Sequence, residues 1–206
     1  MLDTEMLAPD PLILASGSKT RARMLRAAGV AIEIAIPAID EPELMASLKA
    51  SGATTSRVAE VLAEMKAKRI APRFPARFVL GCDQMLECDG LWLDKPADRA
   101  HAREQLKMLR GQSHSLVTSA VLVRDEERLW HHTDRAEMRM RDFSDEFLEH
   151  YLEQAGEDIL RSVGAYQLEG IGAQLFQRVS GDFFTILGLP LLPVLAILRA
   201  HGIVPR

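Results

Sequence analysis

The chain of 206 residues has little cysteine, few aromatic residues and no excess of positive charge. Its only cysteines, Cys82 and Cys88, have no histidine or cysteine partners at metal-ligand spacing, which argues against a zinc site and favours two buried, reduced thiols. Aromatic residues make up 5% of the chain and the formal net charge is −4. Both values argue against a stable nucleic-acid partner, which would require a basic surface with interleaved aromatic side chains.

Long apolar runs are also absent. The longest, residues 186–198, falls short of the ~20 residues of a membrane-spanning helix and is interrupted by Gly188, Pro190 and Pro193. The acidic N-terminal segment MLDTEMLAPDP lacks the pattern of a signal peptide, so we expect a cytoplasmic protein with no membrane partner. The phosphate-binding pattern GxxxxGK[ST] does not occur either, which disfavours a P-loop kinase or hydrolase.

What is present is typical of a globular α/β protein, with 48% hydrophobic and 26% charged residues. We expect an N-terminal extension, residues 1–10, followed by a single domain, residues 11–206. Strand and helix patterns alternate along the chain, with an antiparallel ribbon in the middle, which predicts a mixed twisted sheet with flanking helices. Strands are expected at 12–15, 31–36, 77–82, 114–124, 128–140 and near 174–179, and a hairpin turn at Asp89-Gly90. Helices are expected at 19–28, from Thr54 or Thr55 onward, at 98–110, 144–155 and 190–202, whereas 37–52 is a loop or a short helix.

The most informative stretch is LILASGSKTRARML, residues 12–25. An apolar strand runs into Ser16-Gly17-Ser18 and then into a helix that carries Arg21. Unpaired N–H groups at a helix start, serine hydroxyls and a guanidinium together are typical of a phosphate site. An ordinary strand-to-helix turn is the alternative explanation.

Several separated segments resemble one family. Residues 12–25 are similar to the LASxSPRRxxLL opening of the Maf family, and FVLGCDQ at 78–84 to its strand ending in GADT or GSDQ. Further matches to the GKP, AGAY…G and GLP blocks are Asp94-Lys95-Pro96, Ala165-Tyr166 with Glu169-Gly170, and Gly188-Leu189-Pro190. The blocks follow the family order over roughly residues 11–203, so the resemblance spans nearly the whole chain.

This resemblance implies a house-cleaning nucleoside triphosphate pyrophosphatase. Such enzymes cleave the bond between the α and β phosphates, releasing the monophosphate and diphosphate, with a divalent metal cation (Mg²⁺ or Mn²⁺) as cofactor. The implied fold is similar to that of the inosine triphosphate pyrophosphatases, with two lobes around a cleft. A nucleoside triphosphate would be the main partner, and the resemblance also allows a homodimer.

The resemblance assigns roles to individual residues as well. Asp83, expected at the end of the 77–82 strand, is the implied proton acceptor for the attacking water. It could act as a base with a raised pKa or as a metal ligand, and the sequence does not separate these roles. Glu41 is the implied second metal-binding carboxylate. The implied phosphate-binding residues are Ser16, Ser18, Arg21, Lys66 and Lys95, although a lysine such as Lys66 on a helix is more often part of a solvated face.

Substrate choice is assigned to Thr20, Gln84 and Glu169. Thr20 stands where the family has an arginine, and Asp94 replaces the glycine of GKP. Gln84 with Glu169 resembles the branch that acts on 7-methyl-GTP. A carboxylate can accept hydrogen bonds from guanine N1–H and N2 and favours a cationic base, so a purine preference is predicted. The alternative function is a non-catalytic nucleotide-binding regulator of cell division and septum formation.

Overall fold

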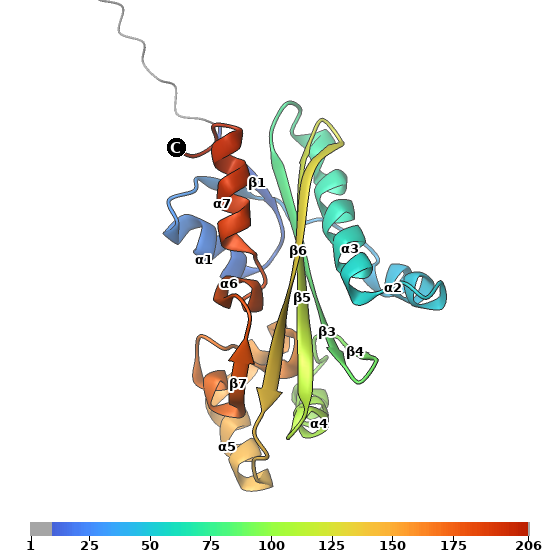
Figure 1. The fold of residues 1–206 in the computed structure, drawn as a ribbon, viewed down its shortest axis with the longest axis vertical. Helices are drawn as coiled ribbons and strands as arrows, with labels where there is room; N and C mark the ends of the chain where they lie inside the picture. The colour runs from blue at the N-terminus through green and yellow to red at the C-terminus, as the bar shows by residue number, and fades with distance from the viewer. Residues whose placement is uncertain (1–9, 206) are drawn as a thin grey trace, which may run out of the picture.

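The computed structural model describes residues 10–205, and all but Asp10 of the expected N-terminal extension, residues 1–10, lies outside that range. A seven-stranded mixed sheet runs through the molecule in the order β2-β1-β3-β5-β6-β7, with β4 paired to β3 (Figure 1). Its strands are β1 (Leu12–Ala15), β2 (Ile32–Ile34), β3 (Val79–Cys88), β4 (Leu91–Leu93), β5 (Ser113–Arg124), β6 (Glu127–Met140) and β7 (Phe176–Ser180). β1 is parallel to β2 and β3, and the other pairs are antiparallel, as the predicted mixed α/β sheet requires.

The helices begin at short polar side chains that bind the free amides of the first turn. Ser18, Thr54, Asp98 and Ser144 each accept a hydrogen bond from the backbone N–H three residues later, which confirms the predicted helix starts. Segment 37–52, for which the sequence allows either a loop or a short helix, contains a helix that is capped by Asp40. The helices are α1 (Lys19–Ala27), α2 (Glu41–Ala50), α3 (Thr55–Ile70), α4 (Arg99–Leu109), α5 (Asp145–Ala155), α6 (Phe183–Ile186) and α7 (Leu191–Ala200). Short 3₁₀ turns lie at Ala71–Arg73, Gly156–Arg161, Val163–Ala165 and Ile171–Leu175.

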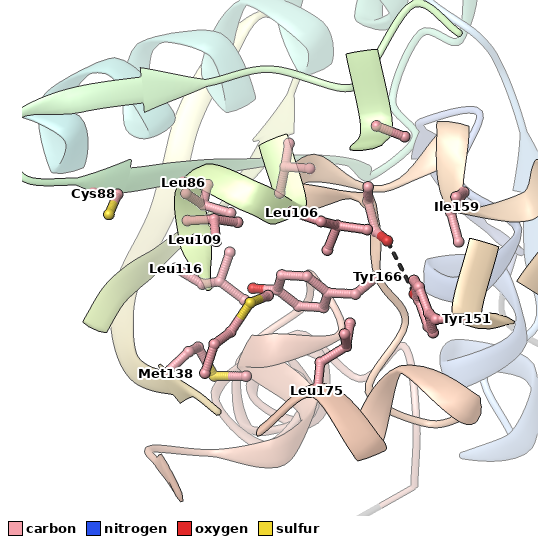
Figure 2. Packing of buried hydrophobic residues seen from close by; sticks show 14 of the residues in the cluster. Leu86, Cys88, Leu106, Leu109, Leu116, Met138, Tyr151, Ile159, Tyr166 and Leu175 are labelled. Atoms are coloured by element: carbon pink, nitrogen blue, oxygen red, sulfur yellow. Dashed lines mark hydrogen bonds between the residues drawn. The ribbon is translucent and has the colours of Figure 1, made fainter. Parts of the chain in front are cut away.

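Two lobes share the long strands of the sheet. In one lobe α1 and α7 cover one face of the sheet and α3 covers the other (Figure 1). In the second lobe, α4, α5 and the 3₁₀ turns enclose a separate core. There Tyr166 packs among Leu116, Met138 and Leu175, and the Tyr151 hydroxyl donates to the Ala165 carbonyl oxygen at 3.0 Å (Figure 2). The predicted two-lobed architecture is therefore confirmed.

Two strand predictions need correction. The strand predicted at 31–36 is shorter, because its pairing with β1 ends at Ile34. Asp83 does not end a strand but lies inside β3, whose parallel pairing with β1 stops at Gly81 while its antiparallel pairing with β5 continues to Glu87. The predicted hairpin turn at Asp89-Gly90 is confirmed, and both residues have the positive φ that such tight turns require. None of the helices within residues 10–205 combines the length and apolar character of a membrane span.

Candidate active site

A cavity of about 1350 Å³ opens between the lobes and is lined by every residue to which the sequence analysis assigned a role in binding or catalysis. It is bordered by the turn between β1 and α1, by α2, α3 and β3, and by the 3₁₀ turns of the second lobe. Its lining includes Ser16, Ser18, Thr20, Arg21, Glu41, Lys66, Asp83, Gln84, Lys95 and Glu169. Residues more than a hundred positions apart in the chain thus face one space.

The turn after β1 fixes its two serines. Ser18 caps α1 by accepting from the Arg21 backbone N–H at 3.3 Å, and Ser16 Oγ accepts from the Ser18 N–H at 3.2 Å. Ser16, which directly follows β1, is buried, and β1 itself lies between β2 and β3. The first turn of α1 therefore presents hydroxyls and helix-start amides to the cavity, as a phosphate site needs.

Arg21 is held by three acceptors from three parts of the chain. Its Nε donates to the Gly188 carbonyl oxygen at 2.6 Å, and its Nη1 donates to Ser16 Oγ at 3.1 Å and to the Cys82 carbonyl oxygen at 2.9 Å. Among residues 10–205 its Nη2 has no hydrogen-bond partner. A guanidinium carries five N–H donors, so the two on Nη2 are left for a ligand.

Lys66 joins the two acidic residues assigned to the site. Its Nζ lies 2.6 Å from Asp83 Oδ1 and 2.9 Å from Glu41 Oε1. The alternative reading of Lys66 as a solvated surface residue is wrong, since its side chain is 10% exposed. It reaches Asp83 because α3 packs closely on β3 at Gly81, where any Cβ would collide with the Ala63 carbonyl oxygen.

Burial controls the charge state of the Asp83 carboxyl. The pKa of Asp83 is raised, because loss of hydration outweighs the attraction of Lys66 and Arg21, and Glu41 adds repulsion. Lys95 stands at the cavity rim. Loss of hydration there, followed by the positive charges of Arg21 and Lys66, lowers the pKa of Lys95. Asp83 thus gains basicity, while the cations around it remain close enough to act on the same ligand.

The donor set can be tested for a divalent cation. No group of three or more His, Cys, Asp or Glu side chains in the described part of the chain could hold a metal ion by itself. Asp83 and Glu41, however, converge on one point, which Lys66 Nζ occupies. Mg²⁺ is commonly bound by one or two carboxylates together with substrate phosphates, so these residues fit a metal that arrives with its nucleotide.

Gln84 and Glu169, which the sequence assigns to substrate choice, differ in the number of contacts that they make with the protein. The amide nitrogen of Gln84 donates to Thr118 Oγ1 at 2.9 Å and to the carbonyl oxygens of Thr185 and Ile186 at 3.0 Å each. Glu169 pairs with Arg23 of α1, Nη2 to Oε1 2.9 Å.

Sequence reasoning missed the roles of two of these lining residues. Arg23 was given no role because it lies in a helix rich in arginine, where one more cation carries no special signal. The contact between Arg21 and the Gly188 carbonyl oxygen was missed because any residue type has a backbone carbonyl, so the sequence does not indicate which one Arg21 binds. Only the GLP block itself pointed to that region.

Comparison with known proteins places these residues in one family. The model described as Maf-like protein matches residues 11–201. A nucleoside triphosphate pyrophosphatase from Paramagnetospirillum magneticum is 55% identical over 190 residues, covering 92% of this chain and 98% of that protein. A 7-methyl-GTP pyrophosphatase from Rhizobium meliloti is 49% identical over 191 residues, covering 93% and 96%.

Among solved structures, a HAM1 protein from Coxiella burnetii overlaps 65% of this chain and 74% of its own, with 18% identity and a TM-score of 0.43. That overlap adds nothing to the family assignment, which the sequence matches carry. The cavity residues and the match across residues 11–201 agree: the chain belongs to the family of Maf-like proteins.

Proposed function

We propose that the protein hydrolyses nucleoside triphosphates between the α and β phosphates, releasing the monophosphate and diphosphate. The names of its relatives support this activity, since they are called nucleoside triphosphate pyrophosphatase and 7-methyl-GTP pyrophosphatase. The observation that carries the proposal is the contact of Asp83 with Lys66 in a cavity that also receives Arg21 and the serine turn.

Asp83 is the proposed proton acceptor. Its raised pKa makes its carboxylate a better base than a free aspartate, and a water held by it would lose a proton to the carboxylate as it attacks phosphorus. Lys66 keeps the carboxylate oriented through the 2.6 Å contact. The lysine also offsets negative charge that builds up beside Asp83 during the attack.

The triphosphate would be held by the cations and donors that line the cavity beside Asp83. The two N–H groups on Arg21 Nη2 are positioned to donate to phosphate oxygens, a pairing that guanidinium groups favour. Ser16 and Ser18 add hydroxyl and helix-start donors, and Lys95 adds a positive charge at the rim. Together these groups hold the chain of phosphates against Asp83.

We propose Asp83 and Glu41 as the residues that hold the divalent cation. Mg²⁺ or Mn²⁺ bound there would supply Lewis-acid stabilisation of the phosphate charge. Both carboxylates contact the same Lys66 Nζ, and this shared contact places them close enough to each other to bind one cation beside the lysine, which supports this assignment.

For the base, we propose a preference for 7-methyl-GTP or another purine nucleotide. The Glu169 carboxylate would accept hydrogen bonds from N1–H and N2 of guanine, and thymine offers only one such donor. Arg23 pairs with this carboxylate and balances its charge. Because Arg23 partly neutralises Glu169, the pair attracts the cationic 7-methylguanine less than Glu169 alone would. Arg23 therefore influences the choice between 7-methyl-GTP and GTP.

The test is pyrophosphate release from a panel of nucleotides with Mg²⁺ or Mn²⁺, coupled to inorganic pyrophosphatase. We expect turnover of GTP and 7-methyl-GTP, and a loss of roughly 10³-fold in kcat for Asp83→Asn, within the range of general-base catalysis. The variant should keep its fold, because asparagine has nearly the same shape. Binding of triphosphates without pyrophosphate release would instead favour the non-catalytic regulator.

A further inference from the structure

We propose that the turn from Asp182 to Gly188 is the positioning element for Arg21, with Gln84 and Thr185 as its positioning residues. This inference rests on the proposed function, since Arg21 matters only if a phosphate is bound. It assigns Gln84 a structural task beside the role in base choice that the family resemblance implies.

The contact with Arg21 is made by the last residue of the turn. The Gly188 carbonyl oxygen accepts from Arg21 Nε at 2.6 Å. Gly188 has a φ of +93°, and a Cβ there would lie 3.4 Å from Arg21 Nη2 and 3.7 Å from Gln84 Oε1. A Cβ would thus only touch these groups, and it is the positive φ that favours glycine at this position.

Gln84 ties this turn to the sheet. Its amide nitrogen has two hydrogens and three acceptors, the Thr118 hydroxyl and the carbonyl oxygens of Thr185 and Ile186. No N–H of this amide is left for a nucleotide base. What Gln84 can offer a ligand is its carbonyl oxygen, and that atom lies on the side of Gly188.

Thr185 anchors the same turn through its buried side chain and its backbone carbonyl. Its side chain is fully buried, and its Oγ1 lies 2.9 Å from Asp134 Oδ2 and 3.2 Å from Asp182 Oδ1. Its backbone carbonyl also accepts from Thr118 Oγ1 at 2.9 Å and from the Gly188 N–H at 3.0 Å. A buried network of this kind loses free energy when one member is removed, so the turn has one favoured position.

The consequence concerns which edge of Arg21 meets the substrate. With Nε and Nη1 fixed on protein acceptors, the guanidinium cannot rotate, and Nη2 is presented in a constant orientation. Preorganised donors of this kind cost no rearrangement when phosphate charge develops.

A double-mutant cycle tests the proposal. Thr185→Val keeps the shape but removes the hydroxyl, whereas Thr185→Ser keeps it, and both are made in the wild type and in Arg21→Ala. In the wild-type background, we expect Thr185→Val to weaken binding of the uncleavable analogue α,β-methylene-GTP about tenfold. The value of kcat/KM for GTP should fall by the same factor. This factor corresponds to the loss of one charge-assisted hydrogen bond between Arg21 and phosphate. In Arg21→Ala the same substitution should change either value less than twofold, and Thr185→Ser should restore the wild-type values.

Equal losses in both backgrounds would overturn the proposal, and so would a folded Thr185→Val variant that matches the wild type. Thermal unfolding identifies a variant that has lost its fold, in which case Gln84→Met, which removes the donors to the turn, takes its place in the same cycle. Because analogue binding needs no turnover, a wild-type chain that releases no pyrophosphate would contradict the proposed function and leave the binding cycle to decide this inference.

Discussion

The two ends of the cavity are built differently. At the phosphate end, Asp83 and Lys66 are buried against each other, and Arg21 makes three hydrogen bonds to the protein. At the other end, the Arg23 side chain is 65% exposed, and Glu169 has it as an ion-pair partner. The phosphate end is therefore fixed by folding itself, whereas the base end can change its residues without disturbing a core.

The largest effect should come from breaking the buried pair at the phosphate end. Lys66→Met leaves Asp83 and Glu41 without their shared cation, and we expect the free energy of unfolding to fall by about 3–4 kcal/mol. Chemical denaturation measures this loss. The matched control is Lys68→Met on the same helix, whose side chain is 44% exposed and pairs with Glu64, and it should cost less than about 1 kcal/mol. Similar losses in both variants would contradict the comparison.

The second prediction concerns the core beneath the base end. His114 is buried, its Nε2 lies 2.7 Å from the Tyr166 hydroxyl, and burial lowers the pKa of His114 to about 4. The unfolded chain, with a histidine pKa near ~6.5, binds a proton between pH 6.5 and 4 that the folded chain does not. Stability from this group is thus present at pH 7 and decreases by up to about 3 kcal/mol as the pH falls to 4.

Unfolding curves measured between pH 7 and 4 test this expectation. His114→Gln removes the titrating group and should flatten the decline by that amount, whereas His150→Gln, at an exposed position on α5, should leave it as in the wild type. If the decline of His114→Gln matches that of the wild type, this histidine does not control the acid stability.

The smallest effect is expected at the base end. Arg23→Ala frees the Glu169 carboxylate and removes a positive charge that opposes a cationic base. The ratio of kcat/KM for 7-methyl-GTP to that for GTP should rise by up to about tenfold, or about 1.4 kcal/mol. Arg103→Ala breaks an exposed pair with Glu149 outside the cavity and should leave the ratio unchanged. A ratio that falls in Arg23→Ala would reverse our reading of the pair.

Features that depend on neighbouring residues could be predicted from the sequence. Asp98 and Ser144 were identified as helix starts because a cap acts within one turn. The mixed sheet followed from alternating patterns and from the antiparallel ribbon of β5 and β6. The candidate site was found through the family blocks, and their residues do line one cavity.

Features that depend on contacts between distant segments could not be predicted. Whether Lys66 faces solvent or Asp83 depends on how closely α3 approaches Gly81, and neither segment encodes that distance alone. Asp83 was placed at a strand end because its apolar run stops there, yet β5 continues to pair with β3 beyond it. Likewise two of the three partners of Gln84 come from α6, about a hundred residues later in the chain.

Cys82 precedes Asp83 in β3. Its carbonyl oxygen accepts a hydrogen bond from Arg21, and its thiol is buried in the core. Burial raises the pKa of Cys82 to about 11, so at neutral pH the sulfur carries a proton and has no route to solvent. Oxidants and alkylating reagents consequently have no thiolate to attack next to the proposed base. Catalysis beside this cysteine should be indifferent to the redox state of its surroundings.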